Sequence, residues 1–442
     1  MKKVLFFFSL ILSLTACHEG EDPDYYKKKE KGQEQIDRTV LVYISGENDL
    51  STFIRPELEE LCQGSKNIGN NALVVYVDDA NSSHLPCIMR IKDGVFVDST
   101  LFEKDEYSSA PNVMSRVLNY TSEHYPAQEY GLVLWGHSSG WILEDSIATK
   151  SAALQLPRKG YGVDNGLNAY QSNGKWMNIY TLAKTLNAWQ HLKFIFADCC
   201  QFQCIESAYE LRNTTDYIIA SPAEVPGKGA PYQTITKGFF ERSDSFYRII
   251  VDNYFAQSFY ISYQNANYYS RTPLSVVKTA ELDQLAVATN AALHSFLPTA
   301  NNTCPDLLNE KLIYYRGKIS NTSENIEYDM NDLMRRFVSP EAYAIWKEAF
   351  DRVVVYKVNA KEGWMTNNQI LPYVFGRGND GTEKEQILTD ERYGGMSMFL
   401  PQDRPGSSYA PHQAETVSYE GHNASIKHTS WYGAARLAEF GW

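Results

Sequence analysis

The sequence has few of the features that mark metalloproteins, disulfide-rich proteins or nucleic-acid-binding proteins. It contains no His-Glu-x-x-His motif and no distant pair of Cys-x-x-Cys motifs, the ligand spacings that hold zinc in many proteins. Only 7 of its 442 residues are cysteines, and those at positions 199, 200 and 204 crowd together, so neither a disulfide scaffold nor a metal site is expected. Its 41 Lys and Arg face 53 Asp and Glu, an acidic balance that argues against a nucleic-acid partner.

Apolar and aromatic residues are abundant instead. Hydrophobic residues make up 43% of the chain and aromatic residues 13%, including 30 tyrosines. This composition is typical of a packed globular protein, and the length allows a large core. No internal repeat is visible.

The N-terminus has the pattern of a bacterial export signal. Lys2 and Lys3 precede an apolar stretch that ends in Leu-Thr-Ala-Cys at residues 14–17. The stretch is too short to span a bilayer as a stable helix, so we predict a signal peptide over residues 1–16. A cysteine at the cleavage point resembles the lipobox of bacterial lipoproteins and makes Cys17 the predicted lipidation site. An ordinary cleaved signal peptide is the alternative.

The residues after Cys17 are acidic and then mixed in charge. The acidic part resembles the surface-export signal of Bacteroidetes lipoproteins. Residues 17–37 show no apolar period and are predicted to form a flexible tether. We therefore expect an exported protein that its lipid anchors to the outer membrane, facing the periplasm or the cell exterior.

Short apolar runs then alternate with helical patterns over residues 38–235. Each run is apolar throughout, which favours a mainly parallel sheet with helices on both faces, an α/β fold. In such sheets ligands bind beyond the carboxyl ends of the strands. The predicted strands are 39–44, 72–77, 131–135, 193–197 and 217–220, and the predicted helices are 112–120, 179–189 and 205–211.

The alternation weakens after residue 235. Residues 236–390 are predicted to form a mainly helical subdomain, with one helix over residues 280–297 and another that begins at Ser339-Pro340. Residues 391–442 contain an apolar run, 395–401, that is predicted to be a late strand returning to the core.

Residues 136–140, Gly-His-Ser-Ser-Gly, follow the third predicted strand and permit two kinds of hydrolase. They match the Gly-x-Ser-x-Gly elbow of serine hydrolases, with Ser138 as nucleophile and His422 or His428 as base. The following residues lack the helical period that such an elbow requires. Alternatively His137 is the base and Cys200, after the fourth predicted strand, is the nucleophile, because both then lie at one rim of the sheet. The backbone N–H groups of Ser138 and Cys200 would form the oxyanion hole.

Two segments carry a family resemblance. Residues 132–141, Leu-Val-Leu-Trp-Gly-His-Ser-Ser-Gly-Trp, are similar to the histidine motif of the clostripain family (peptidase family C11), usually Trp-Asp-His-Gly-Ser-Gly-Trp. Asp-Cys-Cys at residues 198–200, with Ile-Glu-Ser-Ala-Tyr-Glu-Leu at 205–211, resembles its Asp-Ala-Cys motif and the helix that follows. The Asn-Asp-Leu at residues 48–50 and the late strand also match. The resemblance implies a caspase-like fold, a cysteine endopeptidase that acts on peptides or proteins, and Cys200 rather than Cys199 as nucleophile.

The sequence departs from the family pattern near the substrate. Gly-Ala-Pro-Tyr at residues 229–232 stands where the family commonly has Gly-Trp-Asp-Tyr, whose aspartate favours Arg or Lys at P1, the residue before the cleaved bond. Asp198 or Glu224 are the candidates to replace that aspartate, although Asp198 could instead cap the following helix. The altered motifs and the many tyrosines leave a second function open: a surface lipoprotein with a peptidase-like fold that binds peptide or glycan without cutting it.

The resemblance also implies processing between the two motifs. Lys150, Arg158 and Lys159 lie in a stretch without helical or strand period and are the candidate cleavage sites. No cofactor is needed for the chemistry, and the resemblance leaves a structural or activating calcium ion open.

Overall fold

The computed structural model describes residues 36–142, 160–166, 174–263, 266–296, 312–316, 327–366, 369–371, 388–400 and 425–442. The predicted sites at Cys17, Lys150, Arg158, Lys159 and His422 lie outside these residues. Among the described helices, none is long and apolar enough to cross a membrane.

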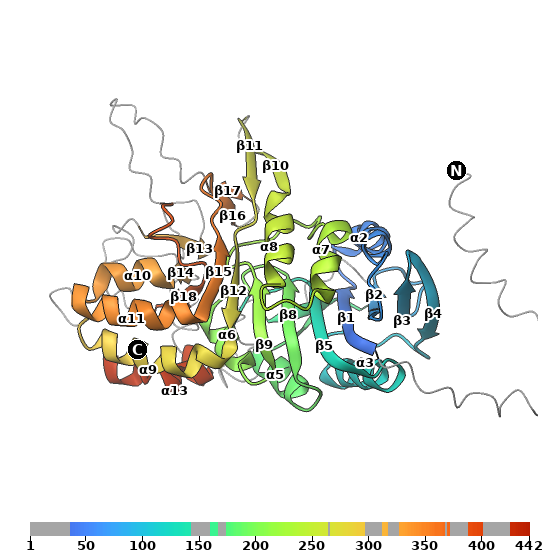
Figure 1. The fold of residues 1–442 in the computed structure, drawn as a ribbon, viewed down its shortest axis with the longest axis horizontal. Helices are drawn as coiled ribbons and strands as arrows, with labels where there is room; N and C mark the ends of the chain where they lie inside the picture. The colour runs from blue at the N-terminus through green and yellow to red at the C-terminus, as the bar shows by residue number, and fades with distance from the viewer. Residues whose placement is uncertain are drawn as a thin grey trace, which may run out of the picture. The chain divides into compact units, whose positions relative to one another are not determined.

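A nine-stranded sheet forms the centre of the fold (Figure 1), in the order β15-β12-β9-β8-β5-β1-β2-β3-β4. Neighbouring strands from β9 to β2 run parallel, and the pairs at both edges are antiparallel. The predicted α/β class and all five predicted strands are confirmed. The parallel strands are β1 (Ile36–Gly46), β2 (Ala72–Asp79), β5 (Ala127–Gly136), β8 (Leu192–Asp198) and β9 (Thr215–Ala220), and the edge strands are β3 (Cys87–Lys92), β4 (Val95–Leu101), β12 (Leu274–Lys278) and β15 (Val354–Val358).

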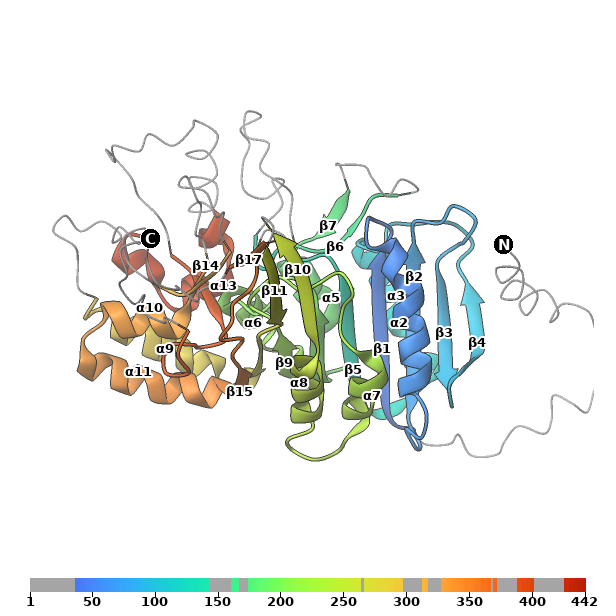
Figure 2. The same cartoon turned by 90° about the horizontal axis from the view of Figure 1, so that it is seen from above.

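Helices cover both faces of the sheet (Figure 2) because both faces of its central strands are apolar. Side chains alternate along a strand, so in β5 Leu132 and Leu134 pack on one side while Val133 and Trp135 pack on the other. The first side is covered by α3 (Pro111–His124), α5 (Ile179–Asn187) and α6 (Ile205–Leu211), and the second by α2 (Ser51–Gly64), α7 (Tyr232–Phe240) and α8 (Tyr247–Ala256).

The strand order creates a crevice between β1 and β5. The chain leaves β1 toward β2 on one side, and it leaves β5 toward β8 on the other. At such a topological switch point the two connections diverge beyond the carboxyl ends of the strands and leave room for a ligand. The loops after β1, β5 and β8 therefore face a common space.

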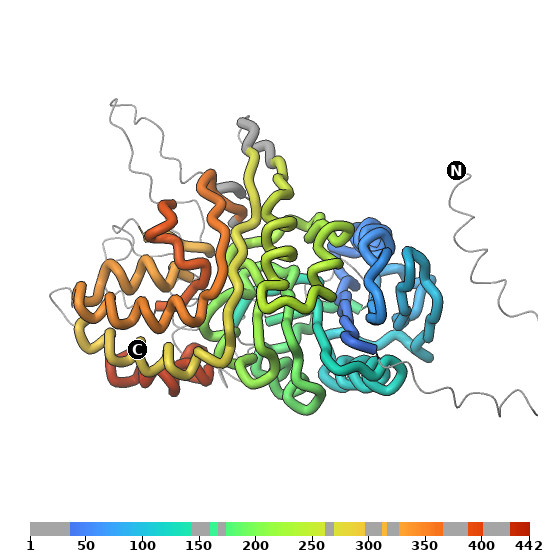
Figure 3. Tube along the Cα trace, viewed as in Figure 1, coloured from blue at the N-terminus to red at the C-terminus, as the bar shows by residue number. Residues whose placement is uncertain are grey.

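The C-terminal half supplies strands as well as helices (Figure 1), and much of its trace, orange to red, lies at the other end of the sheet from β2 to β4, which are blue (Figure 3). Its described helices include α9 (Leu282–Leu293), α10 (Met330–Phe337), α11 (Pro340–Val353) and the short α13 (Ser430–Ala434). As predicted, the Ser339 side chain caps α11 by accepting from Ala342 N, with Pro340 as first residue. The hairpins β10–β11 (Ser258–Tyr263, Ala266–Arg271) and β16–β17 (Trp364–Thr366, Gln369–Leu371), and the edge strands β12 and β15, were not predicted.

The predicted late strand does return to the core. β18 (Ser397–Phe399) pairs antiparallel with β14 (Glu327–Asp329), which pairs with β13 (Tyr314–Arg316). Ser397 N donates to Gln203 O at 3.0 Å, and Phe399 N donates to the buried Glu206 side chain at 2.8 Å. The end of the chain thus supports the segment that directly follows Cys200.

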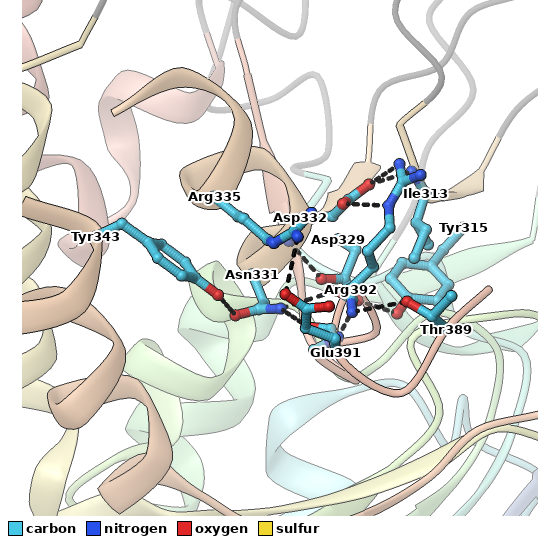
Figure 4. A network of polar contacts seen from close by, with 11 residues as sticks. Ile313, Tyr315, Asp329, Asn331, Asp332, Arg335, Tyr343, Thr389, Glu391 and Arg392 are labelled. Atoms are coloured by element: carbon cyan, nitrogen blue, oxygen red, sulfur yellow. Dashed lines mark hydrogen bonds and ion pairs between the residues drawn. The ribbon is translucent and has the colours of Figure 1, made fainter. Parts of the chain in front are cut away.

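A hydrogen-bonded acidic network joins α10 to the segment before β18 (Figure 4). Asp332 accepts two bonds from the Arg392 guanidinium, at 2.7 and 2.8 Å, and one from Ile313 N at 2.9 Å. Asp329 accepts from the Tyr315 hydroxyl and from the backbone N–H groups of residues 394 and 395. These carboxylates tie segments distant in sequence to one another.

Candidate active site

His137 lies one residue beyond β5, after a glycine with a positive φ of 144°. A Cβ at Gly136 would approach Ser45 O to 2.7 Å, so a side chain does not fit there. The family motif has aspartate at this position, so this chain departs from it at a point of close backbone contact. It also sets the direction in which the chain leaves β5 toward His137.

An aspartate in the loop after the neighbouring strand β1 contacts His137. His137 Nε2 and Asp49 Oδ1 lie 2.6 Å apart, and this hydrogen bond is the main cause that lowers the pKa of Asp49. If Nε2 donates to the carboxylate, Nδ1 is the acceptor of the neutral ring. The sequence analysis did not assign Asp49 a role. The available signal was its position shortly after a predicted strand, and the pairing of β1 with β5 then brings it to His137.

The two adjacent cysteines after β8 differ in surroundings. Cys199 is 1% exposed, its thiol donates to Leu134 O at 3.5 Å, and burial raises its pKa well above the usual value. Cys200 is half-buried, and its sulfur accepts from Val225 N at 3.3 Å. A thiol must be accessible to react, so the geometry favours Cys200 as the sequence did.

His137 and Cys200 line one pocket of about 480 Å³. Its wall comes from the ends of β1, β5 and β8 and the loops that follow them, from the start of α2, from β7 (Lys175–Met177), from the segment before α7 and from β16. All four residues predicted around the chemistry, His137, Ser138, Asp198 and Cys200, contact this pocket, and so does Glu224. The further lining residues are Asp49, Leu50, Phe53, Trp135, Gly136, Ser139, Trp176, Cys199, Gln201, Val225, Pro226, Gly227, Gly229 and Met365.

The backbone at Ser138 is held in an extended form. Ser138 faces Tyr161 in an antiparallel bridge, flanked by bonds from Gly162 N to His137 O at 2.9 Å and from Ser139 N to Gly160 O at 3.0 Å. In this type of pair the N–H groups of the two facing residues point away from each other. The Ser138 N–H is therefore directed away from Tyr161, as an oxyanion donor requires.

The Ser138 side chain is not arranged as a nucleophile. It is 7% exposed, and its oxygen accepts from Gly140 N at 3.1 Å. His428, one of the two bases considered for a serine hydrolase, is exposed in the turn Ile426–His428 and is not part of the pocket. The geometry therefore disfavours the serine hydrolase interpretation.

Asp198 does not cap the following helix. The N-cap of α6 is Cys204, whereas Asp198 accepts from Ala230 N at 2.9 Å and from the hydroxyls of Tyr232 and Tyr254, each at 3.0 Å. The capping expectation was wrong because a loop separates β8 from α6. Burial raises the pKa of Asp198 to about 6, although its three hydrogen bonds act in the opposite direction.

A second carboxylate lies close to Asp198. A Cβ at Gly229 would lie 2.6 Å from Glu57 Oε1 and 2.9 Å from Asp198 Oδ2, so both carboxylates meet at this glycine of the pocket wall. Burial, followed by the charge of Asp198, raises the pKa of Glu57 to about 10. Sequence analysis missed Glu57, because only the packing of α2 against the segment before α7 brings it to the site.

The sequence matches one known protein family over most of its length. The sequence model of the clostripain family matches residues 42–435, nearly all of the chain after the predicted tether. The chain belongs to the clostripain family. It is accordingly a cysteine peptidase, a hydrolase that acts on peptide or protein substrates. No curated protein matches the sequence.

Solved structures of the same family share the fold. A secreted C11 cysteine protease from Bacteroides thetaiotaomicron, in complex with an irreversible peptide inhibitor, is 27% identical, with a TM-score of 0.66 over 91% of this chain and 99% of that one. An inactive zymogen C11 protease from Parabacteroides distasonis is 24% identical, with a TM-score of 0.64 over 91% and 98%. The predicted caspase-like fold of the clostripain family is thus confirmed, and the alternative of a non-catalytic binding protein is disfavoured.

Proposed function

We propose that this chain is a cysteine endopeptidase in which Cys200 is the nucleophile and His137 the base, and that it cleaves after Arg or Lys. We further propose that it is exported and held to the outer membrane by a lipid on Cys17. The observation that carries the catalytic proposal is the pocket shared by His137 and Cys200 at the switch point of the sheet.

The residues are suited to acyl transfer through a thioester. His137 Nδ1 takes the thiol proton, and the Cys200 thiolate attacks the carbonyl carbon of the scissile bond. The negative charge that develops on the carbonyl oxygen is stabilised by the N–H groups of Ser138 and Cys200. His137 returns the proton to the amine as the C–N bond breaks. A water molecule, deprotonated by His137, then attacks the thioester, and the acid and the free thiol are released.

Asp49 would act on this reaction through His137. Its carboxylate fixes the ring orientation and stabilises the imidazolium that forms when the thiol is deprotonated. The carboxylate is 65% exposed, and exposed ion pairs are weak because water competes. We therefore expect Asp49 to be a positioning residue with a moderate contribution.

The basic P1 preference rests on the acidic part of the pocket. Pro231 stands where the family pattern has an aspartate, but Asp198 and Glu224 line the pocket and Glu57 lies behind Gly229. An Arg or Lys side chain that enters would bring a positive charge beside these buried carboxyl groups, which would favour their ionised forms and pair with them. Asp198 and Glu57 thus replace the missing aspartate.

Peptide substrates that differ only at P1 test both parts of the proposal. We expect cleavage of Arg and Lys substrates by the wild type, no cleavage by Cys200→Ala or His137→Ala, and most of the activity in Ser138→Ala and in the matched control Cys199→Ala. Alkylation by an irreversible thiol reagent should label Cys200 and should slow markedly in His137→Ala. Activity that survives in Cys200→Ala would refute the nucleophile, and preferred cleavage after apolar residues would refute the P1 assignment alone.

A further inference from the structure

Trp176 is a pocket residue that has no role in the catalytic steps proposed above. It is the middle residue of β7, and its ring centroid lies 6.4 Å from that of His137, with 50° between the ring planes. It lines the pocket that His137 shares with Cys200, and it is half-buried. A large aromatic ring therefore borders the base, with part of its surface open to the pocket.

The strand pair β6–β7 fixes the direction of this side chain. β6 (Tyr161–Asp164) lies at the carboxyl end of β5 (Figure 2), where Ser138 bridges to it, and β7 pairs antiparallel with β6. Side chains alternate along a strand, so Trp176 points to the opposite side from both of its neighbours. Met177 packs in the core, and the Lys175 ammonium lies 3.7 Å from the centre of the Tyr107 ring. The same backbone unit thus holds the oxyanion segment and aims Trp176 into the pocket.

The chemistry assigns the surroundings of His137 to one half of the substrate. The acyl half, which carries the P1 side chain, stays bonded to Cys200 when the C–N bond breaks, whereas the leaving amine receives its proton from His137. The base must come within hydrogen-bond reach of that nitrogen. The nitrogen belongs to P1′, the residue after the cleaved bond, and the P1′ Cα is bonded to it. The P1′ side chain therefore begins beside the His137 ring.

The acidic part of the pocket belongs to the other half. Asp198 is two residues before Cys200 at the end of β8, and Glu224 directly precedes Val225, whose N–H donates to Cys200 Sγ at 3.3 Å. These carboxyl groups thus lie around the residue that holds the acyl half, whereas Trp176 lies beside the residue that protonates the leaving half. The two ends of one pocket differ in chemistry, acidic on one side of the cleaved bond and aromatic on the other.

We propose that Trp176 forms the wall of the P1′ subsite and that the peptidase prefers a large apolar or aromatic residue directly after the cleaved bond. This inference rests on the proposed function, because it takes His137 as the base. An apolar P1′ side chain that packs on the indole removes apolar surface of both groups from water. Asp49, which is hydrogen-bonded to the same histidine and 65% exposed, adds negative charge at this end and disfavours an acidic P1′ residue.

Cleavage of peptides that differ only at P1′ tests the subsite. The P1′ residue is Phe, Gly or Glu, and P1 is kept at the residue that the wild type cleaves fastest, so that an error in the P1 assignment does not affect the result. A methyl ester of the same acyl half has no P1′ residue and reports on His137 and Cys200 alone. The test variant is Trp176→Ala, and the matched control is Lys175→Ala, the preceding residue of β7, whose side chain points away from the pocket. Circular dichroism reports whether each variant is folded, and Trp176→Gln, which keeps much of the side-chain bulk, replaces Trp176→Ala if it is not.

We expect the wild type and Lys175→Ala to cleave the Phe peptide with a kcat/KM about tenfold higher than the Gly peptide, and the Glu peptide most slowly. Trp176→Ala should bring the Phe and Gly peptides to within about twofold of each other and should hydrolyse the ester at the wild-type rate. A preference for Phe that is absent from the wild type, or that survives in Trp176→Ala, would overturn the proposal. An equal loss on peptides and ester would assign Trp176 to the support of His137 instead, and would also overturn it.

Binding of the same peptides to Cys200→Ala, measured by fluorescence anisotropy, repeats the comparison without turnover. The Phe peptide should bind more tightly than the Gly peptide, and the difference should disappear when Trp176→Ala is added. If the wild type cleaves none of the substrates but this difference in binding is found, the catalytic proposal is refuted and the subsite stands. Equal binding of the Phe and Gly peptides would overturn the subsite, whatever the wild type cleaves.

Discussion

Two buried acidic groups among the described residues use the same kind of residue in opposite ways. In the C-terminal network (Figure 4), Asp329 and Asp332 receive donors from a tyrosine, from backbone N–H groups and from Arg392. At the rim of the sheet, Glu47 and Asp78 are just as buried, yet oxygens of both lack a partner among the described residues. Burial raises the pKa of Asp329 to about 6 but that of Asp78 to about 9.

The difference shows what hydrogen-bond donors do for a buried charge. In both groups the loss of water disfavours the charged carboxylate and raises its pKa. Donors aimed at a carboxylate stabilise its ionised form and limit that rise. A carboxylate that is fully bonded within the protein has a structural role. One that is buried without donors stays protonated at neutral pH, because burial disfavours its charged form. Asp198, with three donors and a place in the pocket wall, lies between these cases.

The largest loss of stability is expected in the C-terminal network, where the hydrogen-bond donors to the carboxylates are most numerous. Asp332→Ala should lower the free energy of unfolding by about 3–5 kcal/mol, because it leaves the Arg392 charge without its bidentate partner in a poorly hydrated site. Asp390→Ala, which removes the exposed ion pair with Lys361, should cost at most about 1 kcal/mol. Urea denaturation measures both values. Similar losses in the two variants would mean that the network in Figure 4 is not more important than a surface ion pair.

A smaller, pH-dependent effect is expected for Asp198. Its pKa is raised from 3.8 to about 6 in the folded chain, so the native state binds its proton more tightly than the unfolded state does. The associated stability is present below about pH 4 and is lost as pH rises through about 6, a change of about 3 kcal/mol. The stability of Asp198→Asn relative to the wild type, measured as the difference between their free energies of unfolding from pH 4 to 7, should therefore increase with rising pH.

The same ionisation should appear in catalysis. In the wild type, kcat/KM for Arg and Lys substrates should rise with pH through about 6, because a charged Asp198 attracts the P1 cation. Asp198→Asn should lose that rise and most of the preference for basic over neutral P1 residues. An unchanged ratio of basic to neutral cleavage would remove Asp198 from substrate recognition.

Asp49, the exposed carboxylate, should matter moderately and only for catalysis. Asp49→Ala should lower kcat about tenfold, roughly 1.4 kcal/mol, with little change in KM, because it orients His137 without contacting the substrate. Asp79→Ala, at the equivalent strand end of β2, is the control and should leave kcat unchanged. A rise in KM with unchanged kcat would assign Asp49 to substrate binding instead.

The smallest effect is expected in the group that lacks donors. Asp78→Asn should change the free energy of unfolding by less than about 1 kcal/mol, since the amide replaces a carboxyl group that burial already keeps protonated at neutral pH. Urea denaturation of the variant beside the wild type measures the change. A large loss would make this group structural and would remove its contrast with Asp332.

Sequence alone determined the elements whose signals are local. The parallel strands were predictable because each is apolar over its whole length, and Ser339-Pro340 marked the start of α11 because a helix needs an N-terminal cap. His137 and Cys200 were predictable as pocket residues because both follow strands and the carboxyl ends of parallel strands share one rim. The edge strands β12 and β15 were not predicted because their sequences carry no such local signal. Their place in the sheet depends on which sheet edge remains unpaired once the other elements have packed.

Tertiary structure decided which side chains meet at that rim. Asp49 reaches His137 because β1 is the neighbour of β5, and Glu57 reaches Asp198 because α2 packs beside the segment before α7. Glu47, Asp78 and Asp105 converge only once β1, β2 and the connection after β4 are in place. Carboxylates repel one another, so no local preference brings them together. The packing of the apolar strands and helices supplies the free energy that holds them close, and this is why their sequence positions alone did not reveal the group.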